Sequence, residues 1–267
     1  AARVITMTKK SAVEEKIVEL KSSASGESPV RRKGIYLLPN LLTTGALFAG
    51  FYAVLSGFSG KYELAAIAIF TAMVFDGLDG RVARMTNTQS AFGVQYDSLS
   101  DMVSFGVAPA VVAYGWGVSD LGTLGLAAAF VYASCGALRL ARFNVQAESS
   151  DSKVFTGLPS PAAAALVAGF VWSTYSLEPS VGLSVLGAIL TAVAGLLMVS
   201  NFKYPSFKEI DMRGKVPFFV ILAVAMLFVV ITIDPPRILF AMAMVFSFSA
   251  PVIWLAKRLG FGLPTKD

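Results

Sequence analysis

Long apolar runs recur along almost the whole sequence, separated by short polar, Gly-containing or Pro-containing turns. An α-helix needs roughly 20 apolar residues to cross the hydrocarbon core of a bilayer, and these runs have about that length. We expect about eight spans with the approximate bounds 35–58, 62–80, 99–117, 122–143, 158–175, 181–200, 216–233 and 236–255. Because the runs are too long and too closely spaced for the alternating pattern of barrel strands, the chain is predicted to be all-α, a polytopic transmembrane helical bundle.

The composition agrees with a membrane protein and indicates an orientation. Hydrophobic residues make up 55% of the 267, charged residues only 15%, and the mean hydropathy is +0.68, values far from those of a soluble domain. With the N-terminus inside, 20 of the 22 Lys and Arg residues fall on the cytoplasmic side, leaving Lys61 and Arg237 outside. Basic residues accumulate in cytoplasmic loops, so both termini are predicted to be cytoplasmic. Residues 1–34 are expected to form a polar cytoplasmic tail.

Two absences narrow the chemistry that this chain can perform. The sequence contains no histidine and one cysteine, Cys135, which falls in the middle of a predicted span. Histidine bases, phosphohistidine intermediates and cysteine metal clusters are thereby excluded, and Cys135 is expected to be a buried apolar side chain. The net charge of +5 comes from basic residues dispersed among loops, which favours attraction to anionic lipids over nucleic-acid binding.

The stretch DGLDGRVARMTNTQSAFGVQYDSLSD, residues 76–101, brings acidic side chains to the predicted cytoplasmic edge of the membrane. Helix positions three, four or seven residues apart share a face. Two stripes result, one with Asp76, Asp79, Gly80 and Ala83 in the second span, the other with Gly93, Asp97 and Asp101 in the third. If the two helices are antiparallel, the four carboxylates converge.

Converging carboxylates repel one another and need compensation, most of all near a bilayer. An all-oxygen ligand set without His or Cys favours Mg²⁺ or Mn²⁺. The small residues between the carboxylates leave room for a nucleotide, and Arg84 is positioned to reach a phosphate oxygen. Helix capping by individual aspartates and an acidic cation-transport path are the alternatives.

These residues also resemble a known family. Asp79, Gly80, Ala83, Arg84, Gly93, Asp97 and Asp101 match the pattern DGxxARx8GxxxDxxxD without a gap, and Asp76 supplies its additional leading aspartate. The pattern is the signature of the CDP-alcohol phosphotransferases, membrane enzymes that move a phosphatidyl or similar group from a CDP-linked donor to an alcohol and release CMP. The resemblance implies a six-helix catalytic core, here residues 35–200, and a homodimer. Residues 201–267 would add a cytoplasmic loop, two further spans and a short tail.

The resemblance also implies a role for each matching position. Asp76, Asp79, Asp97 and Asp101 would bind two divalent metal ions, Mg²⁺ or Mn²⁺, and Asp101 would also act as the general base. The CDP-binding cleft would be lined by Gly80, Ala83, Arg84 and Gly93. A kink near Pro39 would bring Asn40 and Thr43 toward the donor's phosphates, although a plain interfacial helix start explains these residues equally well.

The acceptor alcohol has to be predicted from residues outside the shared motif. The stretches DSLSDMVSFGVAPA at 97–110, ALRLARFN at 137–144 and FTGLPSPAAA at 155–164 resemble the membrane-embedded, bacterial phosphatidylserine synthase branch of the family. This resemblance implies CDP-diacylglycerol and L-serine as substrates and the bacterial cytoplasmic membrane as the location. Glycerol 3-phosphate and inositol are the alternative acceptors, and a divalent-cation transporter is the alternative outside the enzyme class.

Serine carries a carboxylate, so its pocket needs a cation. Arg139 and Arg142 lie three residues apart at the cytoplasmic end of the fourth span, with Asn144 nearby, and we expect these three residues to bind the acceptor. The alternative is that both arginines are topogenic charges that reach the membrane interface. Ser160, between two prolines, would belong to a rigid loop that shapes the pocket.

Overall fold

The computed structural model describes residues 29–86, 88, 90–148, 156–177, 180–204 and 218–259. Within these ranges the backbone is helical, with one isolated antiparallel bridge between Thr156 and Lys203. The order of elements is α2 (Pro29–Phe58), α3 (Tyr62–Met85), α4 (Ala91–Asp101), the π-helix η1 (Met102–Val107), α5 (Ala108–Trp116), the 3₁₀-helix η2 (Val118–Leu121), α6 (Thr123–Glu148), α7 (Ser160–Thr174), α8 (Val181–Val199), α9 (Phe218–Ile233) and α10 (Pro235–Arg258). The predicted all-α membrane bundle is confirmed, whereas most of the predicted tail, residues 1–34, lies outside the described residues.

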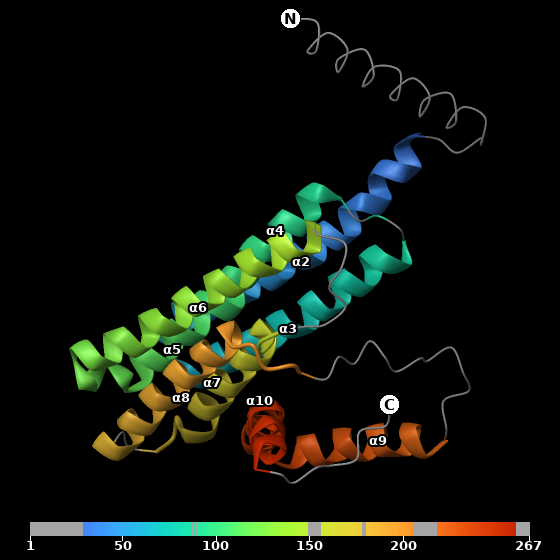
Figure 1. Ribbon diagram of the computed structural model, residues 1–267. Helices are drawn as coiled ribbons and strands as arrows, with labels where there is room; N and C mark the ends of the chain where they lie inside the picture. The colour runs from blue at the N-terminus through green and yellow to red at the C-terminus, as the bar shows by residue number, and fades with distance from the viewer. Residues whose placement is uncertain are drawn as a thin grey trace, which may run out of the picture.

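Helices α2 to α8 pack side by side as a bundle, and α9 and α10 lie at an angle to them (Figure 1). Close pairs are α2 with α3, α6 with α8, and α7 with both α3 and α10. Small side chains occupy many of the contacts, and Ala53, Ala65 and Ala72 are completely buried. Lipid tails are as apolar as the helix surfaces, so small residues that let backbones approach closely, rather than hydrophobic burial, hold membrane helices together.

Four helices within the described part of the chain are long and apolar enough to cross a membrane, namely α2 from Leu38, most of α6, α8 and α10, and α7 is a shorter apolar helix. Helix α3 is long enough, but Asp76, Asp79, Arg81 and Arg84 in its last turns lower its hydropathy. The count of eight spans therefore stays a prediction. The turn IDPPR does separate two helices, because Asp234 caps α10 by accepting a hydrogen bond from the backbone N–H of Arg237 at 3.4 Å.

The third predicted span differs most from its expected bounds. It was placed at 99–117, yet helix α4 already begins at Ala91, where the Ser90 side chain caps it by accepting a hydrogen bond from the N–H of Gly93 at 3.0 Å. Helix α4 then continues directly into the π-helix η1 after Asp101. Hydropathy cannot locate this start, because polar residues such as Gln95, Asp97 and Ser98 interrupt the apolar residues of α4. Single π-turns inside helices occur frequently at functional sites.

The last helix, α10, packs against the rest of the bundle through α7. The Tyr204 hydroxyl donates a hydrogen bond to the carbonyl oxygen of Ser247 at 2.8 Å, and the ring of Phe170 lies 5.8 Å from that of Phe240. Cys135 is buried, as expected. Of the two helices α9 and α10, which follow the predicted core, α10 is thus joined to the bundle.

Two glycines of α8 offer a matched test of the packing. A Cβ at Gly195 would lie 2.8 Å from the Cα of Tyr132 on α6, whereas a Cβ at Gly182 would meet nothing within 4 Å. We expect Gly195→Ala to lower the free energy of unfolding by about 1–3 kcal/mol, because overpacking forces the helices apart. Gly182→Ala should change it by less than about 1 kcal/mol, since alanine only improves helix propensity. Thermal unfolding in detergent measures both, and equal stability of the two variants would contradict the α6–α8 contact.

Candidate metal centre

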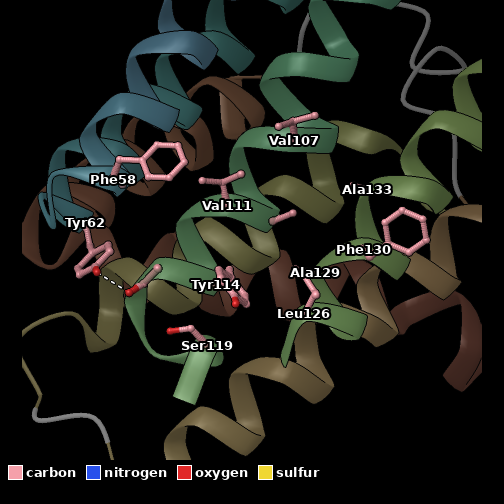
Figure 2. A pocket seen from close by; sticks show the side chains of 13 residues that line it. Phe58, Tyr62, Val107, Val111, Tyr114, Ser119, Leu126, Ala129, Phe130 and Ala133 are labelled. Atoms are coloured by element: carbon pink, nitrogen blue, oxygen red, sulfur yellow. Dashed lines mark hydrogen bonds between the residues drawn. The ribbon is translucent and has the colours of Figure 1, made fainter. Parts of the chain in front are cut away.

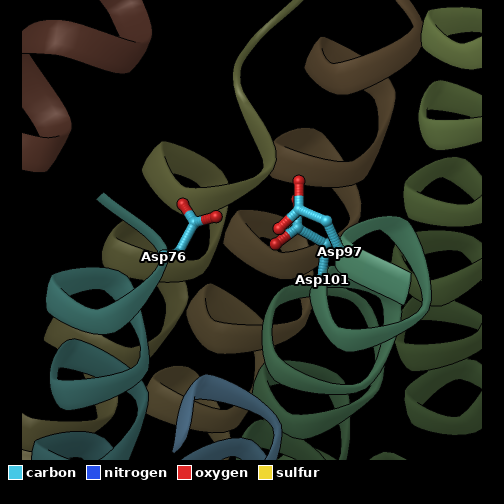
Figure 3. A group of neighbouring side chains, drawn as sticks. All are labelled: Asp76, Asp97 and Asp101. Atoms are coloured by element: carbon cyan, nitrogen blue, oxygen red, sulfur yellow. The ribbon is translucent and has the colours of Figure 1, made fainter. Parts of the chain in front are cut away.

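Three of the predicted carboxylates lie close together. Asp76, Asp97 and Asp101 each offer one oxygen, and these three oxygens all lie within 4.8 Å of one another. Figure 3 shows Asp76 on α3 facing Asp97 and Asp101 on the neighbouring helix. All three side chains are partly buried. The two acidic stripes thus face each other, which is the arrangement expected for antiparallel helices.

The fourth carboxylate, Asp79, is buried beside this group and is hydrogen-bonded to a residue of α2. Its Oδ2 lies 2.8 Å from the Thr43 hydroxyl, which also lies 3.1 Å from the carbonyl oxygen of Pro39. A hydroxyl donates one proton, and a bond to a carboxylate is the stronger choice. Thr43, expected near the donor's phosphates, therefore has Asp79 as its immediate partner and fixes the orientation of that carboxylate.

The predicted cleft residues come from three helices, α2, α3 and α4. A Cβ at Gly93 of α4 would lie 3.6 Å from the Oδ1 of Asn40 on α2, so these two residues are neighbours. A Cβ at Gly80 would lie 3.6 Å from an Nη atom of Arg84, so the guanidinium lies over the small residue on α3. Arg84 is exposed and Ala83 partly buried. Gly80 and Gly93 thus lie against polar side chains, those of Arg84 and Asn40.

Sequence reasoning missed the hydroxyl groups that join α4 and η1 to α2. The Ser100 hydroxyl donates to the carbonyl oxygen of Thr43 at 3.2 Å, and the Ser104 hydroxyl to that of Ala46 at 3.0 Å. The hydroxyl oxygens of Thr44 and Tyr96 lie 2.9 Å apart. The available signal was the four-residue spacing that places Tyr96, Ser100 and Ser104 on one stripe, next to the acidic stripe.

Arg139 is the cation nearest the acidic group among the predicted acceptor residues. Its charge interacts with those of Asp101 and Asp76, and its Nη1 donates a hydrogen bond to the Ser160 hydroxyl at 2.8 Å. The side chain is partly buried, and its Nε is buried without a hydrogen-bond partner among the described residues.

Arg142 and Asn144, the other two predicted acceptor residues, have protein partners. Arg142 donates from Nη1 to the carbonyl oxygen of Val199 at 3.3 Å and from Nη2 to the Oδ1 of Asn201 at 2.8 Å. Asn144 accepts a hydrogen bond from the Ser98 hydroxyl at 3.1 Å. These bonds join α6 to the end of α8 and to α4.

The donor set fits a hard divalent cation. Asp97 experiences the repulsion of Asp79 and Asp76, and Asp101 that of Asp76, Asp97 and Asp79. Magnesium binds oxygen at about 2.0–2.1 Å, so ligands on opposite sides of one ion lie up to ~4.2 Å apart. Small side-chain rotations would let oxygens within 4.8 Å of one another share an ion. A bound cation would also relieve the repulsion.

An apolar pocket of about 550 Å³ lies at the other end of the bundle, between α5 and α6 and near the α2–α3 turn (Figure 2). Aromatic and aliphatic side chains such as Phe58, Val111 and Phe130 line it, and the Tyr62 hydroxyl beside it donates to the carbonyl oxygen of Gly115. Its lining contains neither a carboxylate nor an arginine. The chemistry suggested by the carboxylates therefore belongs to the acidic end.

Comparison with known proteins agrees with the family resemblance of the sequence. The family model described as CDP-alcohol phosphatidyltransferase matches residues 36–200, more than half of the chain. The chain is 39% identical over 198 residues to a protein of Helicobacter pylori strain J99 named CDP-diacylglycerol–serine O-phosphatidyltransferase, covering 73% of this chain and 83% of that one.

Two further similarities were found. A Bacillus subtilis protein with the same name is 36% identical over 172 residues, covering 64% of this chain and 92% of that one. The crystal structure of apo Mycobacterium tuberculosis phosphatidylinositol phosphate synthase aligns with a TM-score of 0.43 at 20% identity, covering 68% of this chain and 90% of that one.

Removing one carboxylate tests the metal centre. We expect Asp97→Asn to weaken Mn²⁺ binding by more than the roughly 10–100-fold that substitution of outer-shell partners costs, because it removes a direct oxygen ligand and a charge. Electron paramagnetic resonance of Mn²⁺ titrated into the detergent-solubilised protein measures the affinity. Asp120→Asn, at an exposed aspartate in η2, is the matched control. Equal affinities of the two variants would contradict the centre.

Thr43 provides a second test through its bond to Asp79. Thr43→Val keeps the shape of the side chain and removes the hydroxyl, so Asp79 loses the bond that orients it. We expect Mn²⁺ affinity to fall about 10–100-fold. Thr43→Ser retains the hydroxyl and should bind Mn²⁺ as the unmodified protein does. A valine variant with undiminished affinity would show that Asp79 needs no orienting partner.

Proposed function

The chain belongs to the CDP-alcohol phosphatidyltransferase family, and from that premise we propose that it transfers the phosphatidyl group of CDP-diacylglycerol to the hydroxyl of L-serine, giving phosphatidylserine and CMP. The names of its relatives from Helicobacter pylori and Bacillus subtilis support serine as the acceptor. The observation that carries the chemistry is the group of Asp76, Asp97 and Asp101 oxygens within 4.8 Å. It lies inside the segment that matches the family model.

We assign the four aspartates to two divalent ions, Mg²⁺ or Mn²⁺. Asp76, Asp97 and Asp101 supply the clustered oxygens, and Asp79 is held beside them by Thr43. When bound, the ions would neutralise charge on the diphosphate and on the phosphoryl group during transfer. Asn40, Gly80, Ala83, Arg84 and Gly93 are the proposed donor-binding residues, with Arg84 directed at a phosphate oxygen.

The reaction follows from these groups. The serine hydroxyl oxygen attacks the lipid-side phosphorus of CDP-diacylglycerol, the bond from that phosphorus to the bridging oxygen breaks, and CMP leaves with the bridging oxygen. Serine hydroxyls are weak nucleophiles at neutral pH, so Asp101 accepts the hydroxyl proton as the new bond forms. The products are phosphatidylserine and CMP, and no covalent enzyme intermediate is required.

The location of the site suits a donor that is half lipid and half nucleotide. Helix α3 begins with an apolar stretch and ends with Asp76, Asp79, Arg81 and Arg84, so the carboxylates lie toward one end of a membrane-embedded bundle. From the distribution of basic residues we assign this end and both termini to the cytoplasmic side of the bacterial inner membrane. A homodimer is the proposed assembly, by similarity to the family.

The decisive assay offers L-serine, glycerol 3-phosphate and inositol separately to the purified protein with CDP-diacylglycerol and Mn²⁺ or Mg²⁺. We expect CMP release with serine only. Asp101→Asn should lower the rate by about 10²–10⁴-fold, the usual contribution of a general base. The same Asp120→Asn variant serves as the control and should retain the rate.

The other outcomes identify what is wrong. Release of CMP with glycerol 3-phosphate or inositol would keep the transfer chemistry and replace the acceptor. No release with any alcohol, together with Mn²⁺ flux into sealed vesicles, would favour the transporter that the sequence left as an alternative.

A further inference from the structure

Two arginines one helical turn apart on α6 have different surroundings. Arg142 uses both terminal nitrogens to bind the end of α8, through Val199 and Asn201. Arg139 has one hydrogen bond among the described residues, from Nη1 to the Ser160 hydroxyl, and its Nε is buried without a partner. A buried N–H without an acceptor is unfavourable, so Arg139 has a donor left over for a ligand.

The geometry of a guanidinium indicates which ligand fits. Its Nε–H and one Nη2–H point in the same direction and form a fork that matches the two oxygens of a carboxylate. Ser160 occupies Nη1, which is outside this fork. The edge containing the unpartnered Nε is therefore the edge suited to a carboxylate. Asp101 and Asp76 are close enough to interact with the Arg139 charge, but in the proposed centre their oxygens are metal ligands.

Ser160 stands on a rigid support. It begins α7 between Pro159 and Pro161. The segment before it is fastened to the end of α8, because the N–H of Gly157 donates to Phe202 O and that of Leu158 to Leu197 O, both at 2.9 Å. Gly157 has φ +88°, and a Cβ there would lie 2.2 Å from Met198 O, so only glycine fits. Arg139 is thereby held in position before any substrate binds.

We propose that Arg139, held by Ser160, binds the carboxylate of the acceptor, while Arg142 and Asn144 brace α6 and do not contact the acceptor. This inference rests on the proposed function and deepens it. Serine would bind with its carboxylate on Arg139 and its hydroxyl toward Asp101, so that one cation selects amino-acid acceptors over alcohols of similar size that lack a carboxylate.

Serinol is the probe that separates carboxylate recognition from the rest of the reaction, because it keeps the hydroxymethyl and amino groups of serine and replaces the carboxylate with a second hydroxymethyl group. In the unmodified protein we expect CMP release to be far faster with L-serine than with serinol. Arg139→Gln should raise the KM for serine about 10–100-fold, the usual worth of hydrogen bonds between charged groups. It should leave turnover with serinol and the KM for CDP-diacylglycerol unchanged.

Arg142→Lys is the matched control from the same helix. It should lower the thermal stability, because it breaks the two bonds to the end of α8, and keep the ratio of serine to serinol rates. Ser160→Ala is the second variant in case Arg139→Gln does not fold. It removes the partner of Nη1 and should raise the KM for serine without changing turnover with serinol.

A merely electrostatic role for Arg139, as a counterion of the carboxylates, gives another pattern. Rates with serine and serinol would then fall together in Arg139→Gln, and that result overturns the proposal. An unchanged serine-to-serinol ratio in both Arg139→Gln and Ser160→Ala overturns it while leaving the proposed function intact. Absence of CMP release from the unmodified protein with serine would overturn both.

Discussion

The mutual repulsion of four carboxylates at the facing ends of α3 and α4 is the constraint that the rest of the structure has to meet. The hydrophobic effect cannot press these ends together, since lipid tails are as apolar as the helices. Hydrogen bonds from hydroxyl groups do so instead. Thr43 of α2 is hydrogen-bonded to Asp79 on α3. Ser100 of α4 and Ser104 of η1 donate hydrogen bonds to carbonyl oxygens of α2. Helix α2 is therefore the clamp that holds the acidic ends in place.

A second wall of the site is formed by the segment before α7 and the end of α8. Backbone hydrogen bonds, rather than hydroxyl groups, hold this wall together. The segment before α7 and the end of α8 share the bridge between Thr156 and Lys203. This wall carries Ser160, and through it Arg139. Asp76 and Asp101 thus interact electrostatically with Arg139, whose partner Ser160 follows a segment held by backbone hydrogen bonds. The acceptor proposed for this site carries both an ammonium and a carboxylate group.

The parts predictable from sequence are those set by local spacing. Aspartates three and four residues apart must share a helix face, so the facing stripes followed from the sequence once the helices were taken as antiparallel. The partners of individual polar side chains were not predictable, because they lie far away in the chain. Thr43 meets Asp79 across 36 residues, and Arg142 meets Val199 across 57. Arg139 and Arg142, one helical turn apart, therefore looked equivalent in the sequence, although the structure gives them different hydrogen-bond partners.

Helix α10, which lies beyond the predicted catalytic core, is connected to the end of α8 and the chain that follows it. On one side, the carbonyl oxygens of Leu197 and Phe202 accept hydrogen bonds from the segment before α7, and Lys203 forms the bridge with Thr156. On the other side, the Tyr204 hydroxyl donates to the carbonyl oxygen of Ser247 on α10, and its ring lies 5.7 Å from that of Phe246 at an interplanar angle of 35°. The Phe202 ring lies 5.7 Å from that of Trp254. Helix α10 thus contacts the chain after α8 through Tyr204 and Phe202, and the same stretch of chain bonds to the segment that supports Ser160. Helix α10 is in this way joined to the loop that holds Ser160, which belongs to the proposed acceptor side of the site.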